Sequence, residues 1–443
     1  MREPWSADQV HALAPDASSL GSARGLAAPG KWQLSGASDG PPASLWGLCK
    51  GSGAHPYQTC VDLDEPAYRC SCPSRKFPCK HALGLLLMWS AGSIAEADMP
   101  AWVAEWHEGR AARAAKTAAK RAAAAEGAEP TPERQRAAAR RAAQRDDRVG
   151  KGVADLAQWL DDQVRQGIAG LDKAGYQHFD RVAARLVDAQ APGLARQVKA
   201  LAGVVSSGEG WDHRLLAELG QLRMLARAYE RLAELPEPLA ETVRARVGFT
   251  LPAEKVLAAP PVRETWQVLG VRDETEERML TRRAWLLGRE TGRFALVLSF
   301  AVAGQALAAD LVLGTEVDAD LHFYPGAVPL RAAVGTRHAP AVRCAGLGPA
   351  GTVAQFLSGY ADALAADPWT PQWPALLRGV LVPGEPWHLV DEAGDALPLD
   401  RATGTPWHLV SAAGGRPAAI AAEWSIDGLR PLALYADSEV LAP

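Results

Sequence analysis

The sequence predicts an α+β multidomain protein with an N-terminal ββα zinc module, a central helical bundle and a C-terminal strand-rich α+β domain. Three cysteines and a histidine gather between Cys70 and His81, apolar residues recur at the helical period over residues 151–247, and short strand-like runs follow residue 251. We expect residues 1–100 to form the zinc module, 101–150 a basic, alanine-rich helical linker, 151–250 the bundle and 251–443 the strand-rich domain.

Composition restricts the partners and the compartment. The net charge of −4 over 443 residues gives no global attraction to nucleic acid, so such a partner requires a local patch. Six cysteines are too few for a secreted disulfide scaffold. The N-terminus lacks the apolar core of a signal peptide, and no run of about 18 apolar residues occurs. We therefore expect a cytoplasmic protein with no membrane partner, where clustered thiols bind metal.

The first hundred residues alternate short elements with turns. Ser6 is placed to cap a helix through Ala14, and a second helix is expected over residues 17–27. Lys80–Trp89 reads as a helix that is apolar at nearly every position and is therefore buried. Strands are expected over residues 31–34, 45–49, 57–63 and 67–72.

The zinc module contains the series Cys-x-Cys, six residues, Cys-x-His. Cys70 and Cys72 lie on the same side of an extended strand, because strand side chains alternate. Cys79 and His81 come at the start of the helix, where free backbone N–H groups favour thiolate. Three thiolates and one imidazole complete a tetrahedral shell around Zn²⁺ and leave no open position. We expect a structural zinc site, and no catalytic residues.

The spacing resembles that of the SWIM zinc finger, and the similarity extends from Trp46 to Trp89 through Pro56-Tyr57, the strand at Val61–Leu63 and Leu85–Leu87. The chain looks like the bacterial SWIM zinc finger family proteins. This resemblance implies a ββα zinc module that binds DNA or protein. It also implies gene neighbourhoods, and hence partners, that include MoxR-type AAA ATPases and von Willebrand-type metal-binding proteins.

Positive charge surrounds the metal series. Arg69, Arg75, Lys76 and Lys80, with Phe77 among them, could contact phosphates and stack on a base. Alternatively, these bases offset the net negative charge of the zinc centre, with Arg75, Lys76 and Lys80 as donors to its thiolates. Because the helix after His81 is apolar, we do not expect it to read base edges.

The segment from Arg110 to Arg148 carries eleven basic and five acidic residues among alanines. Alanine, arginine and lysine favour helix, but few large apolar residues are available to dock it. We expect two solvent-exposed helices, broken near Pro130 and Pro132. They are either a linker or a surface for nucleic acid or an acidic protein.

The rest of the chain divides into the bundle and the strand-rich domain. Periodic residues such as Leu156, Phe179 and Leu222 predict about five helices. Beyond residue 251 we expect a hairpin, Arg282–Gly288 with Arg293–Phe300, and one helix, Thr352–Ala365. Short strands are expected at residues 387–390, 407–410, 419–424 and 431–435, two of them within a repeated Pro-Trp-His-Leu-Val.

Other features admit two interpretations. Cys49 and Cys60 are spare metal ligands or small apolar strand residues, and Cys344 is expected to pack in a core. Gly346–Gly351 fits G-x-G-x-x-G but lacks a following strand with a ribose-binding acid. The C-terminal tryptophans pack a core or line a groove for a peptide. We expect a non-enzymatic protein–protein adaptor, with a DNA- or RNA-binding protein as the alternative.

Overall fold

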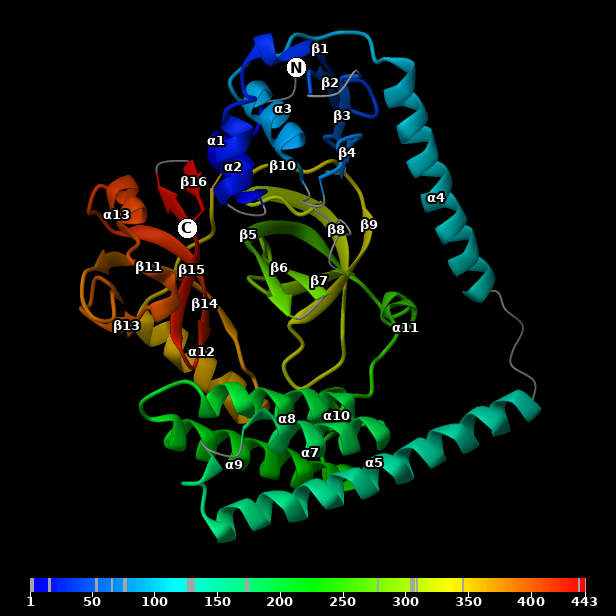
Figure 1. Ribbon diagram of the computed structural model, residues 1–443, viewed down its shortest axis with the longest axis vertical. Helices are drawn as coiled ribbons and strands as arrows, with labels where there is room; N and C mark the ends of the chain where they lie inside the picture. Colours follow the sequence, from blue (N-terminus) through cyan, green and yellow to red (C-terminus); the bar gives the residue numbers. More distant parts are fainter. Residues whose placement is uncertain are drawn as a thin grey trace.

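The computed structural model describes residues 4–14, 17–51, 55–64, 67–74, 78–125, 132–171, 175–276, 279–302, 307, 310–344, 346–436 and 439–442. The zinc module lies at one end of the molecule and the helical bundle at the other, with two β-rich units between them (Figure 1). No helix in these ranges is both long enough and apolar enough to cross a membrane.

The zinc module is an antiparallel sheet with order β1-β2-β3-β4, preceded by two helices and followed by a third. Ser6 forms a capping box with Gln9 at the first helix, as predicted. Residues 81–89 of α3 are all buried, which confirms the expected core helix. The elements are α1 (Ala7–Ala12), α2 (Ala17–Arg24), the 3₁₀ turn η1 (Pro29–Lys31), β1 (Trp32–Ser38), β2 (Ser44–Cys49), β3 (Tyr57–Asp62), β4 (Ala67–Cys70) and α3 (Lys80–Ser90).

Two long helices connect this module to the bundle: α4 (Ala101–Ala125) and α5 (Pro132–Gln166). Trp102, Val103 and Trp106 of α4 pack on the face of the sheet that carries Trp46. Beyond them α4 extends away from the body, and α5 returns to the bundle (Figure 1). The break expected at Pro130 lies outside the described residues, while Pro132 begins α5, a position that suits proline. α5 continues through residue 150 without interruption.

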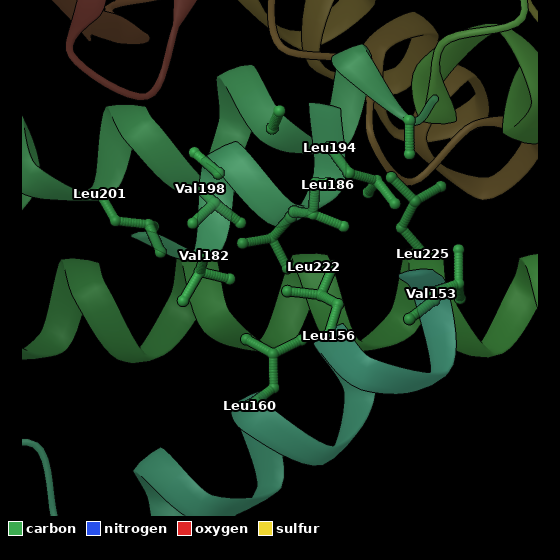
Figure 2. Close-up of a cluster of buried hydrophobic side chains, with 14 of the residues drawn as sticks. Val153, Leu156, Leu160, Val182, Leu186, Leu194, Val198, Leu201, Leu222 and Leu225 are labelled. Atoms are coloured by element: carbon green, nitrogen blue, oxygen red, sulfur yellow. The ribbon is translucent and has the colours of Figure 1, made fainter. Parts of the chain in front are cut away.

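The C-terminal half of α5 forms the bundle with α7 (Tyr176–Asp188), α8 (Pro192–Val205), α9 (Trp211–Glu230) and α10 (Glu237–Val247). Most of the residues predicted from their period lie in one core, in which Leu156, Leu186 and Leu222 are at most 2% exposed. Val164, Tyr176 and Val187 share the period but are exposed. Figure 2 shows these side chains converging from different helices. A 3₁₀ turn, η2 (Leu232–Glu234), joins α9 to α10, and α11 (Ala253–Leu257) leads out of the bundle.

The first β-rich unit closes on itself. Its sheet order is β10-β8-β5-β6-β7-β9, and a further β8–β9 pairing makes β5 to β9 a closed barrel. The predicted hairpin is present as β6 and β7. Closure depends on a parallel β7–β9 pair, which no short sequence pattern indicated. The strands are β5 (Val262–Glu276), β6 (Met279–Gly288), β7 (Phe294–Val302), β8 (Thr315–Phe323), β9 (Arg331–Arg337) and β10 (Val342–Arg343).

The second β-rich unit is a six-stranded antiparallel sheet with order β13-β12-β11-β14-β15-β16. Two helices accompany it: α12 (Val353–Ala366), which confirms the predicted helix with Thr352 as its N-cap, and α13 (Trp407–Ala413). The other elements are β11 (Trp373–Val382), β12 (His388–Val390), β13 (Ala396–Pro398), the 3₁₀ turn η3 (Arg401–Thr403), β14 (Ala418–Ser425), β15 (Gly428–Ala436) and β16 (Glu439–Leu441).

One predicted strand was wrong. The second Pro-Trp-His-Leu-Val, at residues 406–410, begins helix α13 and does not form a strand. The residues that follow each copy decide the outcome. Gly414 adopts the left-handed conformation that ends a helix, whereas Asp391 accepts hydrogen bonds from the backbone N–H groups of Ala393 and Asp395 and so turns the chain from β12 into β13.

The parts are joined by close contacts. Gly270 of β5 lies so near β15 that a Cβ there would be 2.5 Å from Leu432 Cβ, so only glycine permits this approach. Trp369, buried against the bundle, donates its indole N–H to the carbonyl of Gln221 at 3.1 Å. The Gln9 amide of α1 donates to the carbonyl of Leu313, 304 residues away in the sequence.

Candidate metal centre

Two elements bring the metal series together. β4 ends at Cys70, and Cys79 is the N-cap residue of α3, with His81 in its first turn. Cys70 is opposite Thr59 in the β3–β4 register, on the sheet face that α3 covers. The alternation of β4 and the onset of α3 therefore direct side chains from both elements into one place.

The four predicted ligands form one cluster. The ligand atoms of Cys70, Cys72, Cys79 and His81 all lie within 4.8 Å of one another. His81 Nδ1 is 3.6 Å from Cys70 Sγ and 3.9 Å from Cys79 Sγ. A tetrahedral site with Zn–S near 2.3 Å and Zn–N near 2.0 Å has ligand–ligand edges of about 3.5 to 3.8 Å. The donor set and its spacing therefore fit Zn²⁺, with His81 binding through Nδ1.

Neighbouring residues fix the orientation of these ligands. Thr59 Oγ1 lies 3.1 Å from Cys70 Sγ, and the Tyr57 ring packs on the His81 ring with centroids 4.9 Å apart. Neither residue was predicted to support the site. Both occupy alternate positions of β3, so the strand pattern together with the register to β4 would have identified them.

A hydrogen bond between Cys70 and Cys79 shifts the pKa values of the two thiols in opposite directions. A hydrogen bond to Cys79 and burial together raise the pKa of the Cys70 thiol to about 12. The same hydrogen bond from Cys70, with help from the backbone N–H groups of Ala82 and His81, lowers the pKa of Cys79. Cys79 therefore ionises more readily than Cys70, and binding of a divalent metal requires Cys70 to lose its proton.

The remaining cysteines are not in this cluster. Cys49 and Cys60 are both fully buried strand residues and neither belongs to the cluster of four ligands, which agrees with small apolar strand residues. Cys60 faces away from the metal ligands, against Trp46 and Val103. Cys344 is only partly buried, contrary to the expected core position, and its Sγ lies 3.1 Å from the carbonyl oxygen of Gly346 and 3.4 Å from a carboxylate oxygen of Glu316, either of which can accept its proton.

The predicted basic surface is described only in part. Arg69 and Lys80 are exposed, on β4 and at the start of α3. Arg75, Lys76 and Phe77 lie outside the described residues. Of the two described bases, Lys80 lies next to the ligands Cys79 and His81, whereas Arg69 alternates with Cys70 on β4 and therefore belongs to the opposite face of the sheet.

A polar network holds α4 to the sheet. The Asp62 carboxylate, 8% exposed, accepts a hydrogen bond from Arg110 at 2.6 Å, and its Oδ2 lies 3.4 Å from His107 Nδ1. His107 Nε2 is 2.7 Å from Ser44 Oγ. Ser44 is fully buried, so this Asp–His–Ser arrangement has no access for a substrate and acts as an anchor for the helix.

Comparison with protein families identifies two parts of this structure, the zinc module and the helical bundle. Residues 60–90 match the SWIM zinc finger, and residues 144–247 match the SWIM-associated four-helix bundle domain. The first range contains all four metal ligands, and the second covers the bundle from α5 to α10. Comparisons with curated proteins and with solved structures found no match. The chain therefore contains a SWIM zinc finger, whose three cysteines and one histidine form a Cys₃His zinc site, and, further along the sequence, the SWIM-associated four-helix bundle domain.

Proposed function

We propose that this chain is a non-enzymatic adaptor whose zinc finger binds a protein partner in the cytoplasm. The observation that carries the proposal is the closed metal site: four protein donors fill the tetrahedral shell of Zn²⁺. A catalytic zinc needs an open position for water or substrate, and here the metal instead ties β4 to α3. Its role is to hold the shape of the finger.

The burial of α3 favours a protein partner over sequence-specific DNA. Residues 81–89 of α3 are all buried, so this helix cannot enter a major groove. Recognition falls to exposed residues of the finger, such as Arg69 and Lys80, and to the surfaces of the bundle. The family resemblance makes a MoxR-type AAA ATPase complex the first partner to test, and a von Willebrand-type protein the second. A reducing cytoplasm keeps the cysteines available for zinc.

The experiment compares wild type with Cys72→Ser, which removes one ligand. Purified proteins are tested for binding to the candidate ATPase, with metal content measured in parallel. We expect one equivalent of zinc and binding in wild type, and loss of both in Cys72→Ser, while the helical bundle keeps its thermal transition, because a small finger needs its metal to fold.

Cys344→Ser serves as the matched control, because it changes a cysteine outside the metal cluster. It should keep both the zinc and the binding. Equal binding by wild type and a zinc-free Cys72→Ser protein would overturn a zinc-dependent adaptor.

The alternative function, binding of DNA or RNA, is favoured by the exposed bases of α5. Arg136, Arg140 and Arg141 are all exposed and lie on the part of the helix outside the bundle core. Phosphate contacts release counterions, so affinity for a nucleic acid would fall steeply with salt. A salt-insensitive complex with the ATPase, together with no binding of a random DNA duplex at about 0.15 M salt, would exclude this alternative.

A further inference from the structure

A cavity of about 170 Å³ opens between α5 and α7 of the bundle. Its floor consists of Leu156, Val182 and Leu186, which belong to the bundle core (Figure 2). Gly152 also lines it, at a point where an added Cβ would lie 2.5 Å from Ala189 Cβ. The close helix crossing at this glycine and the apolar floor are properties of the packed bundle, so the cavity does not depend on the metal site.

The mouth of the cavity is positively charged. Arg148 and Lys151 of α5 and Arg185 of α7 line it, with Asp155 as the one acid. Lys151 pairs with Asp147 at 2.8 Å. Within the described ranges, by contrast, no ion pair engages Arg148 or Arg185. Two guanidinium groups therefore face solvent beside an apolar floor without a carboxylate partner.

The charge continues along the helix. Arg141 lies seven residues before Arg148, so it falls on the same side of α5, and it is exposed. An extended acidic ligand could thus contact the rim and then follow α5 away from the bundle.

Size and charge together define the occupant. A cavity of about 150 Å³ lined with apolar side chains is large enough for benzene. The floor can therefore take one leucine or phenylalanine side chain, while the rim favours carboxylates beside it. We propose that this cavity binds an acidic peptide segment of the partner through a single apolar anchor residue. This inference rests on the adaptor function and adds a second contact site to it, on the bundle.

The test uses a fluorescein-labelled peptide, Glu-Asp-Glu-Leu-Phe-Glu-Asp-Glu, and fluorescence anisotropy with the full chain. Two companion peptides replace Leu-Phe by Ala-Ala, or the acids by serine and glycine. We expect both companions to bind at least about fivefold more weakly, because each removes one half of the recognition. The double variant Arg148→Glu/Arg185→Glu should weaken binding of the first peptide by about tenfold or more.

The control is Arg181→Glu/Arg196→Glu, which reverses two exposed charges on α7 and α8 outside the cavity lining. It should bind like wild type, and both double variants should keep the thermal transition of the bundle. The proposal would be overturned if both double variants lost peptide affinity to the same extent, or if the Ala-Ala peptide bound as tightly as the first peptide. Self-association of the chain through this face would overturn it as well.

The outcome is separable from that of the adaptor function. Cys72→Ser should bind the peptide normally, because the cavity lies in the bundle. If the peptide does not bind while the chain still captures the ATPase in a zinc-dependent way, only the cavity inference is wrong. If the peptide binds while zinc has no influence on the partner, only the proposed role of the finger is wrong.

Discussion

Cys60 and Cys70 have different roles because their side chains lie on opposite faces of the same sheet. Cys70 stands opposite Thr59, whereas Cys60 stands opposite Arg69 and Trp46, on the other face of the sheet. Because strand side chains alternate, a shift of one position moves a thiol from the metal cluster to the packing under α4. Burial, the main cause, raises the pKa of Cys60 to about 12.

The raised pKa of Cys60 predicts a loss of stability in alkali. Below about pH 9 the thiol is neutral in both folded and unfolded chains; above it the unfolded thiol ionises while the folded one stays protonated to about pH 12. The finger should therefore lose up to about 1.4 kcal/mol per pH unit through this group as pH rises between these values. Cys60→Ala should unfold with a flatter pH dependence in urea titrations followed at the finger.

The matched control for this prediction is Val61→Ala, which removes a fully buried side chain that cannot ionise from the same strand. It should lower the stability of the finger by the same amount at every pH and so keep the wild-type pH dependence. If the stability of Cys60→Ala fell with pH as steeply as that of wild type, Cys60 would ionise as easily in the folded protein as in the unfolded one.

At the scale of elements, α4 depends on a small docking face. Val103 and Trp106 are its buried apolar contacts, and the next turn places His107 and Arg110 at the Asp62 carboxylate. The rest of α4 extends beyond the sheet (Figure 1). The orientation of the whole helix is thus determined by its first three turns.

Asp62→Asn should loosen this helix. The substitution leaves Arg110 with no carboxylate at a largely buried position, which we expect to cost about 2 kcal/mol. Hydrogen exchange of residues 101–110 should become faster, and the finger should melt at a lower temperature. Asp98→Asn, at an exposed residue just before α4, is the control and should change neither. Unchanged exchange in Asp62→Asn would mean that the apolar contacts alone hold α4.

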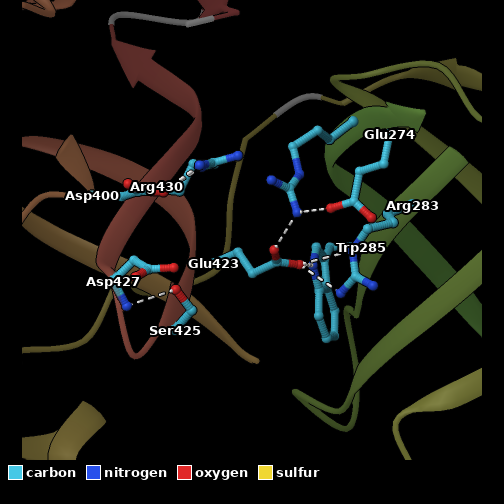
Figure 3. Close-up of polar contacts among 9 residues, drawn as sticks. Glu274, Arg283, Trp285, Asp400, Glu423, Ser425, Asp427 and Arg430 are labelled. Carbon is cyan, nitrogen blue, oxygen red and sulfur yellow. Dashed lines mark hydrogen bonds and ion pairs between the residues drawn. The ribbon is translucent and has the colours of Figure 1, made fainter. Parts of the chain in front are cut away.

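At the scale of the whole molecule, one carboxylate links the barrel to the C-terminal sheet. Glu423 of β14 is 3% exposed and accepts hydrogen bonds from Arg283 at 2.8 Å and Trp285 at 2.7 Å, both on β6 (Figure 3). Arg272 of β5 donates to its other oxygen at 2.9 Å. Leu269 and Ala433 add an apolar contact across the same boundary. The two β-rich units therefore share one interior.

Glu423→Gln should uncouple these two units. It removes the charge that the largely buried guanidinium groups of Arg272 and Arg283 face, which we expect to cost about 3 kcal/mol. Denaturant unfolding followed by tryptophan fluorescence should change from one transition to two. Glu392→Gln removes an exposed pair with Arg378 and should shift stability by less than about 0.5 kcal/mol. A single, unshifted transition in Glu423→Gln would contradict the coupling.

Sequence patterns predicted what local rules determine. The ligands at Cys70, Cys72, Cys79 and His81 follow from spacing alone, and residues such as Leu156 follow from the helical period. The hydrogen bond between Glu423 and Trp285 of β6, which are 138 residues apart, does not follow from local patterns, because it depends on how two sheets pack. The same limit applies to the parallel β7–β9 contact that closes the barrel, and to α13, where a residue beyond the repeat decides the conformation.

The hydrogen bond from Gln9 to Leu313 has a consequence for biosynthesis. Residues 304 positions apart cannot meet until the ribosome has extruded the later one, so the contact between α1 and the barrel forms only after the bundle and much of the barrel have emerged. Such distant pairings form slowly. During that interval α1 can pack on α3 of the finger, where Trp5 lies against Trp89, while the face of α1 that meets the barrel is available to chaperones and proteases.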